Sequence, residues 1–298
     1  MFEYDFFRAE TIDDVLGFLG KYKEKGRVVA GGTDLMVQIR DKDRRFKDLE
    51  AVMDITPLKP LLGQVSEEGD ELLIGALCSH TDLENNALIR KYLGFLSEAC
   101  SLVGSPQIRN MGTVGGSVCN ASPAADPLTP LIAADAVTLI QGPAGEREIA
   151  LADFYHNKGE VDLKPGEFVK GFRVSKLGAG SGSGFVKLGR RKALAISRLN
   201  AAVILRIGED SVIQGAAIAP GCIFSVPERV KKAEELLIGQ KPSDGLFKAA
   251  GEAVSEEMIA RTGIRWSTEY KKPAVETIVA DAVQKAYRNW ALYERGGE

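Results

Sequence analysis

The chain has 298 residues, of which 45% are hydrophobic and 27% charged, and its net charge is −3 at pH 7. This balance is typical of a globular protein of two or three domains, and it gives no reason to expect nucleic acid or an acidic membrane as partner. No apolar run approaches the roughly 20 residues that span a bilayer. The mixed, acidic segment Met1–Arg8 is not typical of a signal peptide, so we expect a cytoplasmic protein.

The first fifty-five residues predict a small β/α unit. Thr11 and Asp14 form a variant of the capping box, and apolar residues then recur with helical spacing through Leu19. Residues 27–30 read as a buried strand, 31–34 as a glycine turn and 36–39 as a helix start, and a strand at 51–55 closes the unit. Strand, glycine turn and helix in this order present free N–H groups to an anion, although a simple helix cap is the alternative interpretation.

Residues 56–176 predict a second α+β unit. Strands are expected at 72–76, 137–140 and 168–174, helices at 81–91 and 94–103, and a short helix opened by Pro127 and Pro130. Between them, 104–126 is rich in glycine and small residues and favours neither helix nor strand. Thr113, Gly115 and Gly116 could form a nest of N–H groups for phosphate, and Asp126 could accept from a sugar hydroxyl or a ring N–H. The plainer alternative is a tight connecting loop.

Residues 177–298 predict a third domain. The run 178–184 contains only Gly, Ala and Ser and has the composition of a flexible linker, so the boundary is placed there. Strands at 185–188, 197–205 and 212–218 should form an antiparallel sheet. A helix opened by a capping box at Ser225, and helices at 244–260 and 273–293, should cover it. The chain contains neither the Gly-x-Gly-x-x-Gly nor the Walker phosphate-binding motif.

The cysteines and histidines predict structural roles. Cys78, Cys100, Cys119 and Cys222 lack the Cys-x-x-Cys spacing typical of zinc or iron–sulfur sites, and we expect buried or partly buried thiols. His80 and His156 are too few for a histidine-rich metal site, so neither a metal ligand nor a catalytic histidine is expected.

Four stretches, taken in order, resemble the FAD-binding medium subunit of the molybdenum hydroxylases, the family of xanthine dehydrogenase and carbon monoxide dehydrogenase. They are AGGTDL at 30–35, IRNMGTVGG at 108–116, ASPAAD at 121–126 and KLGRR at 187–191. The likeness covers the whole chain and is greatest to the xanthine dehydrogenase subunit. It implies an α+β, two-subdomain FAD-binding fold of the vanillyl-alcohol oxidase/p-cresol methylhydroxylase type, followed by a C-terminal domain of three-stranded antiparallel sheet plus helices.

The resemblance also implies where FAD lies. The cofactor should sit between subdomains 1–55 and 56–176, with its pyrophosphate on the N–H groups of 31–35 and 113–117. Asp126 resembles a carboxylate that contacts FAD, Val169 or Phe168 an apolar contact beneath it, and Lys187 a lysine near the flavin ring. A tyrosine that covers the ring in some relatives is missing here, and Ile196 could replace it. The expected cofactor-binding residues are Ala30, Gly31, Gly32, Thr33, Asp34, Leu35, Gly104, Gly112, Thr113, Val114, Gly115, Gly116, Ser117, Asp126, Val169 and Lys187, with no catalytic residue and no metal ligand.

The function that the resemblance implies is electron relay. A small 2Fe–2S subunit would deliver electrons from a large molybdopterin subunit to FAD, and NAD+ would accept them, in a dimer of heterotrimers. An alternative within the same family is that the chain is the medium subunit of a carbon monoxide dehydrogenase or of another aromatic or aldehyde dehydrogenase. Alternatives of another class are a self-contained flavin reductase, which would need its own proton donor and a substrate arginine, and a non-catalytic nucleotide-binding module.

Overall fold

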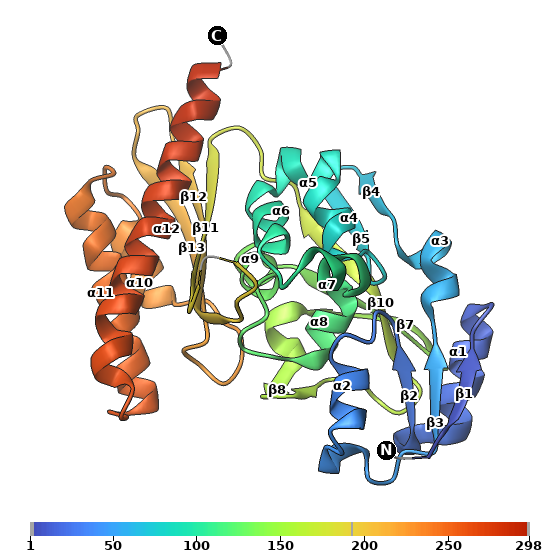
Figure 1. Ribbon diagram of the computed structural model, residues 1–298. Coiled ribbons are helices and arrows are strands. Elements are labelled where there is room, and N and C mark those ends of the chain that lie inside the picture. The colour runs from blue at the N-terminus through green and yellow to red at the C-terminus, as the bar shows by residue number, and fades with distance from the viewer. Residues whose placement is uncertain (1–2, 192, 297–298) are drawn as a thin grey trace.

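The structure is a computed structural model that describes residues 3–191 and 193–296. The N-terminal part is a parallel three-stranded sheet in the order β1-β3-β2, formed by β1 (Asp5–Arg8), β2 (Gly26–Val29) and β3 (Ala51–Asp54). Helix α1 (Ile12–Tyr22) connects β1 to β2, and its expected capping box between Thr11 and Asp14 is confirmed. Helix α2 (Leu35–Arg40) follows the glycine turn after β2 (Figure 1).

The middle part is an antiparallel five-stranded sheet in the order β4-β5-β10-β6-β7. The helix expected at 81–91 is two helices, because Asn86 adopts an extended conformation (ψ 129°) and its side chain caps the second one. The connecting segments include short 3-10 helices and the short helix α3. The bounds are β4 (Val65–Glu68), β5 (Glu71–Gly75), α4 (His80–Asn85), α5 (Ala87–Tyr92), α6 (Gly94–Ser101), β6 (Val137–Gly142), β7 (Gly145–Ala150), β8 (Tyr155–Asn157), β9 (Glu160–Val161), β10 (Phe168–Ser175) and α3 (Lys59–Leu62).

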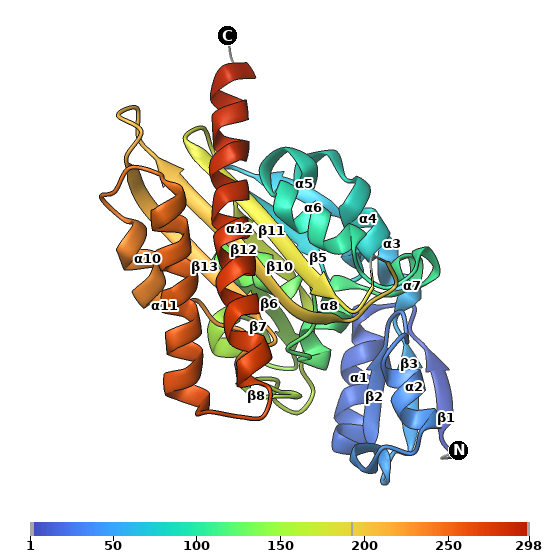
Figure 2. The same ribbon diagram turned by 60° about the vertical axis from the view of Figure 1, so that its left-hand side comes forward.

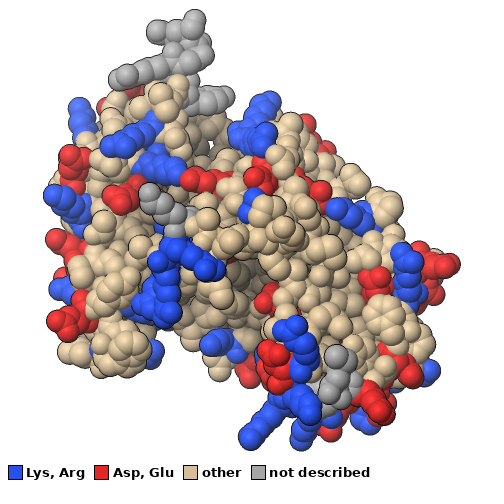
Figure 3. Space-filling view, in the orientation of Figure 1, with Lys and Arg blue, Asp and Glu red and all other residues tan. Residues whose placement is uncertain are grey.

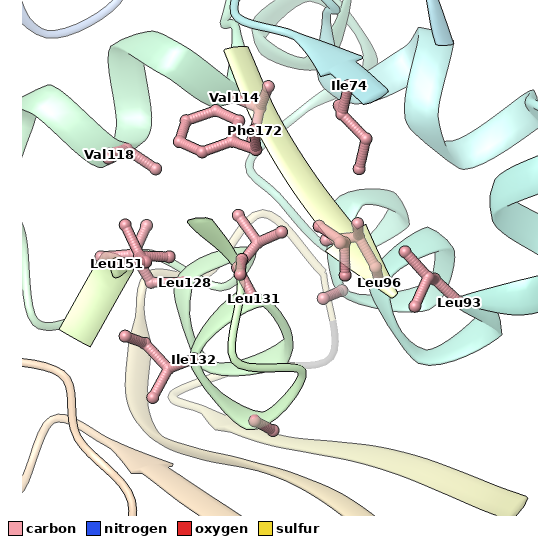
Figure 4. Packing of buried hydrophobic residues seen from close by; sticks show 14 of the residues in the cluster. Ile74, Leu93, Leu96, Val114, Val118, Leu128, Leu131, Ile132, Leu151 and Phe172 are labelled. Carbon is pink, nitrogen blue, oxygen red and sulfur yellow. The ribbon is translucent and has the colours of Figure 1, made fainter. Parts of the chain in front are cut away.

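The glycine-rich segment 104–126 is largely helical, so the expectation of neither helix nor strand is wrong. It forms α7 (Pro106–Met111) and α8 (Val114–Asn120), and α9 (Leu128–Ala133) follows. Val114 and Val118 of α8 are buried beside Phe172 in the main hydrophobic cluster (Figure 4). Tertiary burial therefore outweighs the low helix propensity of glycine, and it leaves the opposite face of α8 directed away from the core.

The C-terminal part is the expected antiparallel sheet, in the order β11-β12-β13. Its strands are β11 (Ser181–Gly189), β12 (Ser197–Ile207) and β13 (Ile213–Gly221). Helices α10 (Lys231–Leu237), α11 (Asp244–Thr262) and α12 (Thr268–Gly296) lie over one face of it (Figure 2). Phe185, Ala202 and Ile204 on the other face belong to the core cluster of the middle part, so the two parts share one packed interior.

The Gly/Ser run at 178–184 is not a flexible linker from Ser181 onward, because β11 begins there. A Cβ on Gly182 would lie 2.1 Å from the carbonyl oxygen of Ala286, and one on Gly184 would lie 2.5 Å from that of Ala282. Both glycines are thus explained by the close approach of α12 to the strand rather than by chain flexibility.

The helix expected from Ser225 begins only at Lys231. The backbone before it bonds to the sheet instead, since the N–H of Val230 donates to the carbonyl of Ile218 at 2.9 Å. The two later helices are present, although α12 begins at Thr268 and not at residue 273, so that Pro273 lies inside it. Within the described ranges, no helix has both the length and the apolar character needed to cross a membrane.

Candidate functional site

The two glycine segments meet between the N-terminal and middle parts. Gly31 packs so closely on α7 that a Cβ there would lie 1.8 Å from the carbonyl oxygen of Met111. Further along, Gln38 Nε2 of α2 donates to Asn120 Oδ1 of α8 at 3.1 Å. Both segments line a cavity of about 290 Å³. The face drawn in Figure 3 is hollowed near its middle, and Lys and Arg side chains gather on either side of the hollow.

The backbone N–H groups of residues 31–35 have no acceptor among the residues that the structure describes. The turn itself depends on Gly32, whose φ is +67°, a value that favours glycine. Asp34 precedes α2 without capping it through its side chain. Because unpaired N–H groups are costly once water is excluded, this stretch is suited to an anion that accepts from several of them.

The opposite segment, 113–117, has fewer free backbone N–H groups for a ligand than its glycines suggest. The N–H groups of Val114 and Gly115 donate to the carbonyls of Cys78 and Ala76, at 3.0 and 2.9 Å. Those of Gly116 and Ser117 donate to Thr113, to Oγ1 and to the carbonyl. The expectation that these amides lie free for a diphosphate is therefore wrong for all four. Gly115 instead lets α8 approach β5, because a Cβ there would lie 2.6 Å from Ala76 Cβ.

A second cavity of about 520 Å³ adjoins the first and shares Ala30, Thr113, Gly116 and Cys119 with it. Its wall includes apolar side chains of Leu77, Val161, Leu163, Phe168 and Val169. Together the two cavities provide a polar compartment beside residues 31–35 and a more apolar one beside β10. A ligand with a charged middle and a flat apolar end fits this division.

The outer wall of the second cavity is the segment 162–168, which Arg147 of β7 holds in place. Its guanidinium donates to Glu167 Oε1 and Oε2 at 2.8 and 2.7 Å and to Asp162 Oδ2 at 2.9 Å. The bidentate contact with Arg147 is the main cause of a lowered pKa for Glu167. Such paired, planar contacts between an arginine and a carboxylate are among the stronger hydrogen bonds of proteins. They therefore hold the segment 162–168 in a defined position as the wall of the cavity.

Asp126 and Lys187 lie together at the junction with the C-terminal part. Asp126 Oδ2 accepts from Lys187 Nζ at 2.6 Å, while Oδ1 accepts from Ser197 Oγ at 2.5 Å and Asn200 Nδ2 at 3.0 Å. Burial raises the pKa of Asp126, against the opposing effects of Lys187 and the two neutral donors. Lys187 Nζ also donates to the carbonyl of Leu102 at 2.8 Å.

The expected site residues fall into four groups in space. Residues 30–35 with Thr113, Gly116 and Ser117 line the first cavity, and Gly115 and Val169 line the second. Gly104 and Lys187 line a third cavity of about 630 Å³ beside the loop at 189–195. Gly112, Val114 and Asp126 line none of these three cavities: Gly112 lies against His80, Val114 in the core and Asp126 in the ion pair.

Several lining residues were missed from the sequence. Gln38, Cys119 and Asn120 reach the first cavity from the two helices, and Leu163 reaches the second. Helical spacing from Asp34 could have suggested Gln38, since Gln38 lies one turn further along and its N–H donates to the carbonyl of Asp34 at 2.9 Å. Leu163 carried no comparable signal, because its segment is irregular and is positioned by contacts with distant residues, among them those of Asp162 and Glu167 with Arg147. The four cysteines are free thiols, two buried and two half-buried, as expected.

Comparison with known proteins agrees with this architecture. Residues 2–176 match the family described as the FAD binding domain in molybdopterin dehydrogenase, and 184–286 match the CO dehydrogenase flavoprotein C-terminal domain. The first match alone covers more than half of the chain. The chain therefore belongs to the family of FAD-binding subunits of the molybdenum hydroxylases, which are subunits of oxidoreductases. The fold class expected from the sequence is confirmed.

Individual relatives cover nearly the whole chain. The nicotinate dehydrogenase FAD-subunit of Eubacterium barkeri is 33% identical over 93% of this chain and 94% of that subunit. The xanthine dehydrogenase FAD-binding subunit of Escherichia coli O157:H7 is 27% identical over 96% of this chain and 97% of that subunit. Among solved structures, reconstituted CO dehydrogenase from Oligotropha carboxidovorans superposes with a TM-score of 0.88 at 25% identity, covering 97% of this chain and 99% of that one.

Proposed function

We propose that this chain holds FAD in the two adjoining cavities and works as the electron-transfer subunit of a multisubunit molybdenum hydroxylase. The observation that carries the proposal is the run of N–H groups at 31–35 that have no acceptor in the described chain and lie where two subdomains meet. A diphosphate carries the charge and the acceptor oxygens that such a run requires. The family membership makes FAD the dinucleotide to test first.

The residues present fit that cofactor. The amides of 31–35 would hold the diphosphate, and the apolar cavity beside Phe168 and Val169 would accept the adenine end. We propose that the flavin end extends beyond these two cavities toward Lys187, which lines the third cavity and is paired with Asp126, and that the lysine's positive charge favours a reduced, anionic ring. Within the described residues we assign no acid–base pair to this chain, because the cofactor itself supplies the redox chemistry.

The proposed partners are a small 2Fe–2S subunit, which delivers electrons, and a large molybdopterin subunit, which oxidises the substrate. FAD, when bound, supplies the chemistry that connects one-electron donors to a two-electron acceptor, and we propose NAD+ as that acceptor. A dimer of heterotrimers is the proposed assembly. The relatives are named for nicotinate, xanthine and carbon monoxide. We propose that the large subunit, and not this chain, determines the substrate.

The cofactor assignment is tested on the purified full chain. We expect a flavin absorbance spectrum and release of FAD on denaturation. Gly31→Ala should reduce FAD content sharply, because the new Cβ would meet the carbonyl of Met111 and separate the two segments. Gly17→Ala in α1 is the matched control, since a Cβ there meets nothing within 4 Å. Equal FAD content in the two variants, both folded by circular dichroism, would contradict the site.

The acceptor and the partners are tested separately. Under anaerobic conditions, NADH should bleach the flavin absorbance of the FAD-loaded complex by the reverse reaction. Absence of bleaching with NADH, in a preparation that dithionite does bleach, would rule out NAD+ as acceptor. Co-purification of the tagged chain with iron and molybdenum tests the partners. If the flavin-loaded chain, without any partner subunit, oxidises NADPH while it reduces a substrate of its own, a self-contained reductase is favoured instead.

A further inference from the structure

His80 is buried directly behind the candidate phosphate site. It opens α4, is 2% exposed, and its backbone N–H donates to the carbonyl of Gly112 at 3.0 Å. The ring lies against the same residue, because a Cβ on Gly112 would come within 3.2 Å of Cδ2 and 3.3 Å of Nε2. The missing side chain at Gly112 therefore admits the imidazole to this position.

The two ring nitrogens of His80 have different surroundings. Nε2 lies 3.2 Å from Ser117 Oγ, whereas Nδ1 is buried and has no hydrogen-bond partner in the described chain. Burial, together with the nearby charge of Arg109, lowers the pKa of His80 to about 4, so the ring is neutral at pH 7 and carries one N–H. A proton on Nδ1 would be a buried donor without an acceptor, and such orphan N–H groups are rare and costly.

The proton of the neutral ring consequently belongs on Nε2, where Ser117 Oγ can accept it. The serine oxygen is then an acceptor toward the ring, and its own O–H is left to donate elsewhere. No protein acceptor takes that hydroxyl proton in the part of the chain that the structure describes. Ser117 lines the first cavity, opposite residues 31–35.

We propose that His80 is a positioning residue for the cofactor: it donates Nε2–H to Ser117 Oγ and thereby directs the Ser117 hydroxyl into the cavity as a donor to the diphosphate. This inference rests on the proposed function. It also explains how α8 contributes to an anion site although the N–H groups of Val114, Gly115, Gly116 and Ser117 already have protein acceptors. The hydroxyl would thus serve as the donor that these four N–H groups, already bonded to Cys78, Ala76 and Thr113, do not supply.

The tautomer is tested without any cofactor. The chain has two histidines, so nitrogen-15 NMR of the full-length protein needs only His156→Gln to assign the ring signals of His80. We expect a neutral ring at pH 7 with the proton on Nε2 and an unprotonated Nδ1. A proton on Nδ1, or a charged ring at that pH, would overturn the inference whatever the chain binds.

The role in binding is tested by FAD titration of the full chain. Loss of a hydrogen bond to a charged phosphate predicts that Ser117→Ala weakens FAD binding about ten- to one-hundred-fold. His80→Leu should weaken it to a similar extent, and His80→Gln, which keeps a side-chain N–H, should restore part of the loss. In the Ser117→Ala background, His80→Leu should add no further loss. The exposed His156→Leu is the control and should bind FAD as the native chain does.

The outcomes separate the two proposals. An equal loss from His80→Leu with and without Ser117 would assign the effect to packing and contradict the positioning role. Full affinity in Ser117→Ala would also overturn it while leaving the FAD assignment intact. If the native chain binds no FAD, the proposed function fails and the cofactor role of His80 fails with it, whereas the NMR result still decides the hydrogen bond itself.

Discussion

Lys187 of β11 and Asp126, which precedes α9, form a buried ion pair with 2.6 Å between Nζ and Oδ2. Their side chains are 9% and 5% exposed, and they come from different parts of the fold. Ser197 and Asn200, both on β12, complete the carboxylate's hydrogen bonds. The pair therefore connects the C-terminal sheet to the segment that follows α8.

Removing one partner of this pair should destabilise the protein strongly. Lys187→Met leaves a buried carboxylate without its counter-charge, and the expected loss in the free energy of unfolding is about 3–5 kcal/mol. The double variant Lys187→Met, Asp126→Asn should recover part of it. Urea unfolding measures the free energy of unfolding of the single and the double variant. The exposed Lys25–Glu50 pair provides the control, because Lys25→Met should change little. If Lys187→Met lowers the free energy of unfolding no more than Lys25→Met does, the buried ion pair does not stabilise the fold.

The cavity wall held by Arg147 should be sensitive to acid. Contact with Arg147 lowers the pKa of Glu167 from its ordinary value of 4.5. A lowered folded-state pKa contributes stability that is present above 4.5 and is lost as the pH falls through the folded value. Urea unfolding at a series of pH values should show this loss, and Glu167→Gln should flatten the curve in that range. A curve of unchanged shape in the variant would mean that other carboxyls carry the acid sensitivity.

The glycines of β11 should not tolerate a side chain. Gly182→Ala places a Cβ 2.1 Å from the Ala286 carbonyl, so the strand or α12 must shift. Such overpacking costs about 1–3 kcal/mol, which thermal unfolding can detect as a lower midpoint. Gly178→Ala, where a Cβ meets nothing within 4 Å, should leave the midpoint unchanged or slightly raised. Equal tolerance at both positions would restore the interpretation of this run as a flexible linker.

The thiols should react slowly in the folded protein. Burial raises the pKa of Cys78 and Cys119 to about 12 and that of Cys222 to about 11, and it raises the pKa of Cys100 further. Thiolate is the reactive form, so little is present at neutral pH. A thiol reagent at pH 8 should label the native chain slowly and all four cysteines rapidly after denaturation. Because Cys119 lines the proposed FAD site, bound FAD should slow its labelling further; rapid labelling of Cys119 in the FAD-loaded chain would contradict that location.

Local patterns predicted much of this molecule. The capping box at Thr11, the buried strands β2, β3 and β5, and the apolar face of α12 with Val275, Val279 and Ala282 all follow from spacing and burial along a single element. The motif resemblance identified the family and the glycine turn at 31–35. These features are encoded within a few consecutive residues, where propensity and periodicity operate.

Glycine was the residue whose role the sequence could not decide. The same lack of a Cβ serves a left-handed turn at Gly32, contact between subdomains at Gly31, helix packing at Gly115 and strand–helix packing at Gly182. Each choice depends on which distant backbone comes close, and that backbone lies tens or hundreds of residues away along the chain. Composition therefore suggested a linker and a loop where packing produced a strand and two helices.

The direction of each backbone N–H was likewise a property of the folded chain. Residues 31–35 and 113–117 look alike as glycine-rich segments, yet within the described chain the N–H groups of 31–35 have no acceptor, whereas those of 114–117 are taken by Cys78, Ala76 and Thr113. The order of residues thus specified the family, most elements and the position of the glycine turn at 31–35. Close packing between separate elements decided which donors remained for a ligand, since hydrogen bonds within the protein compete for the same groups.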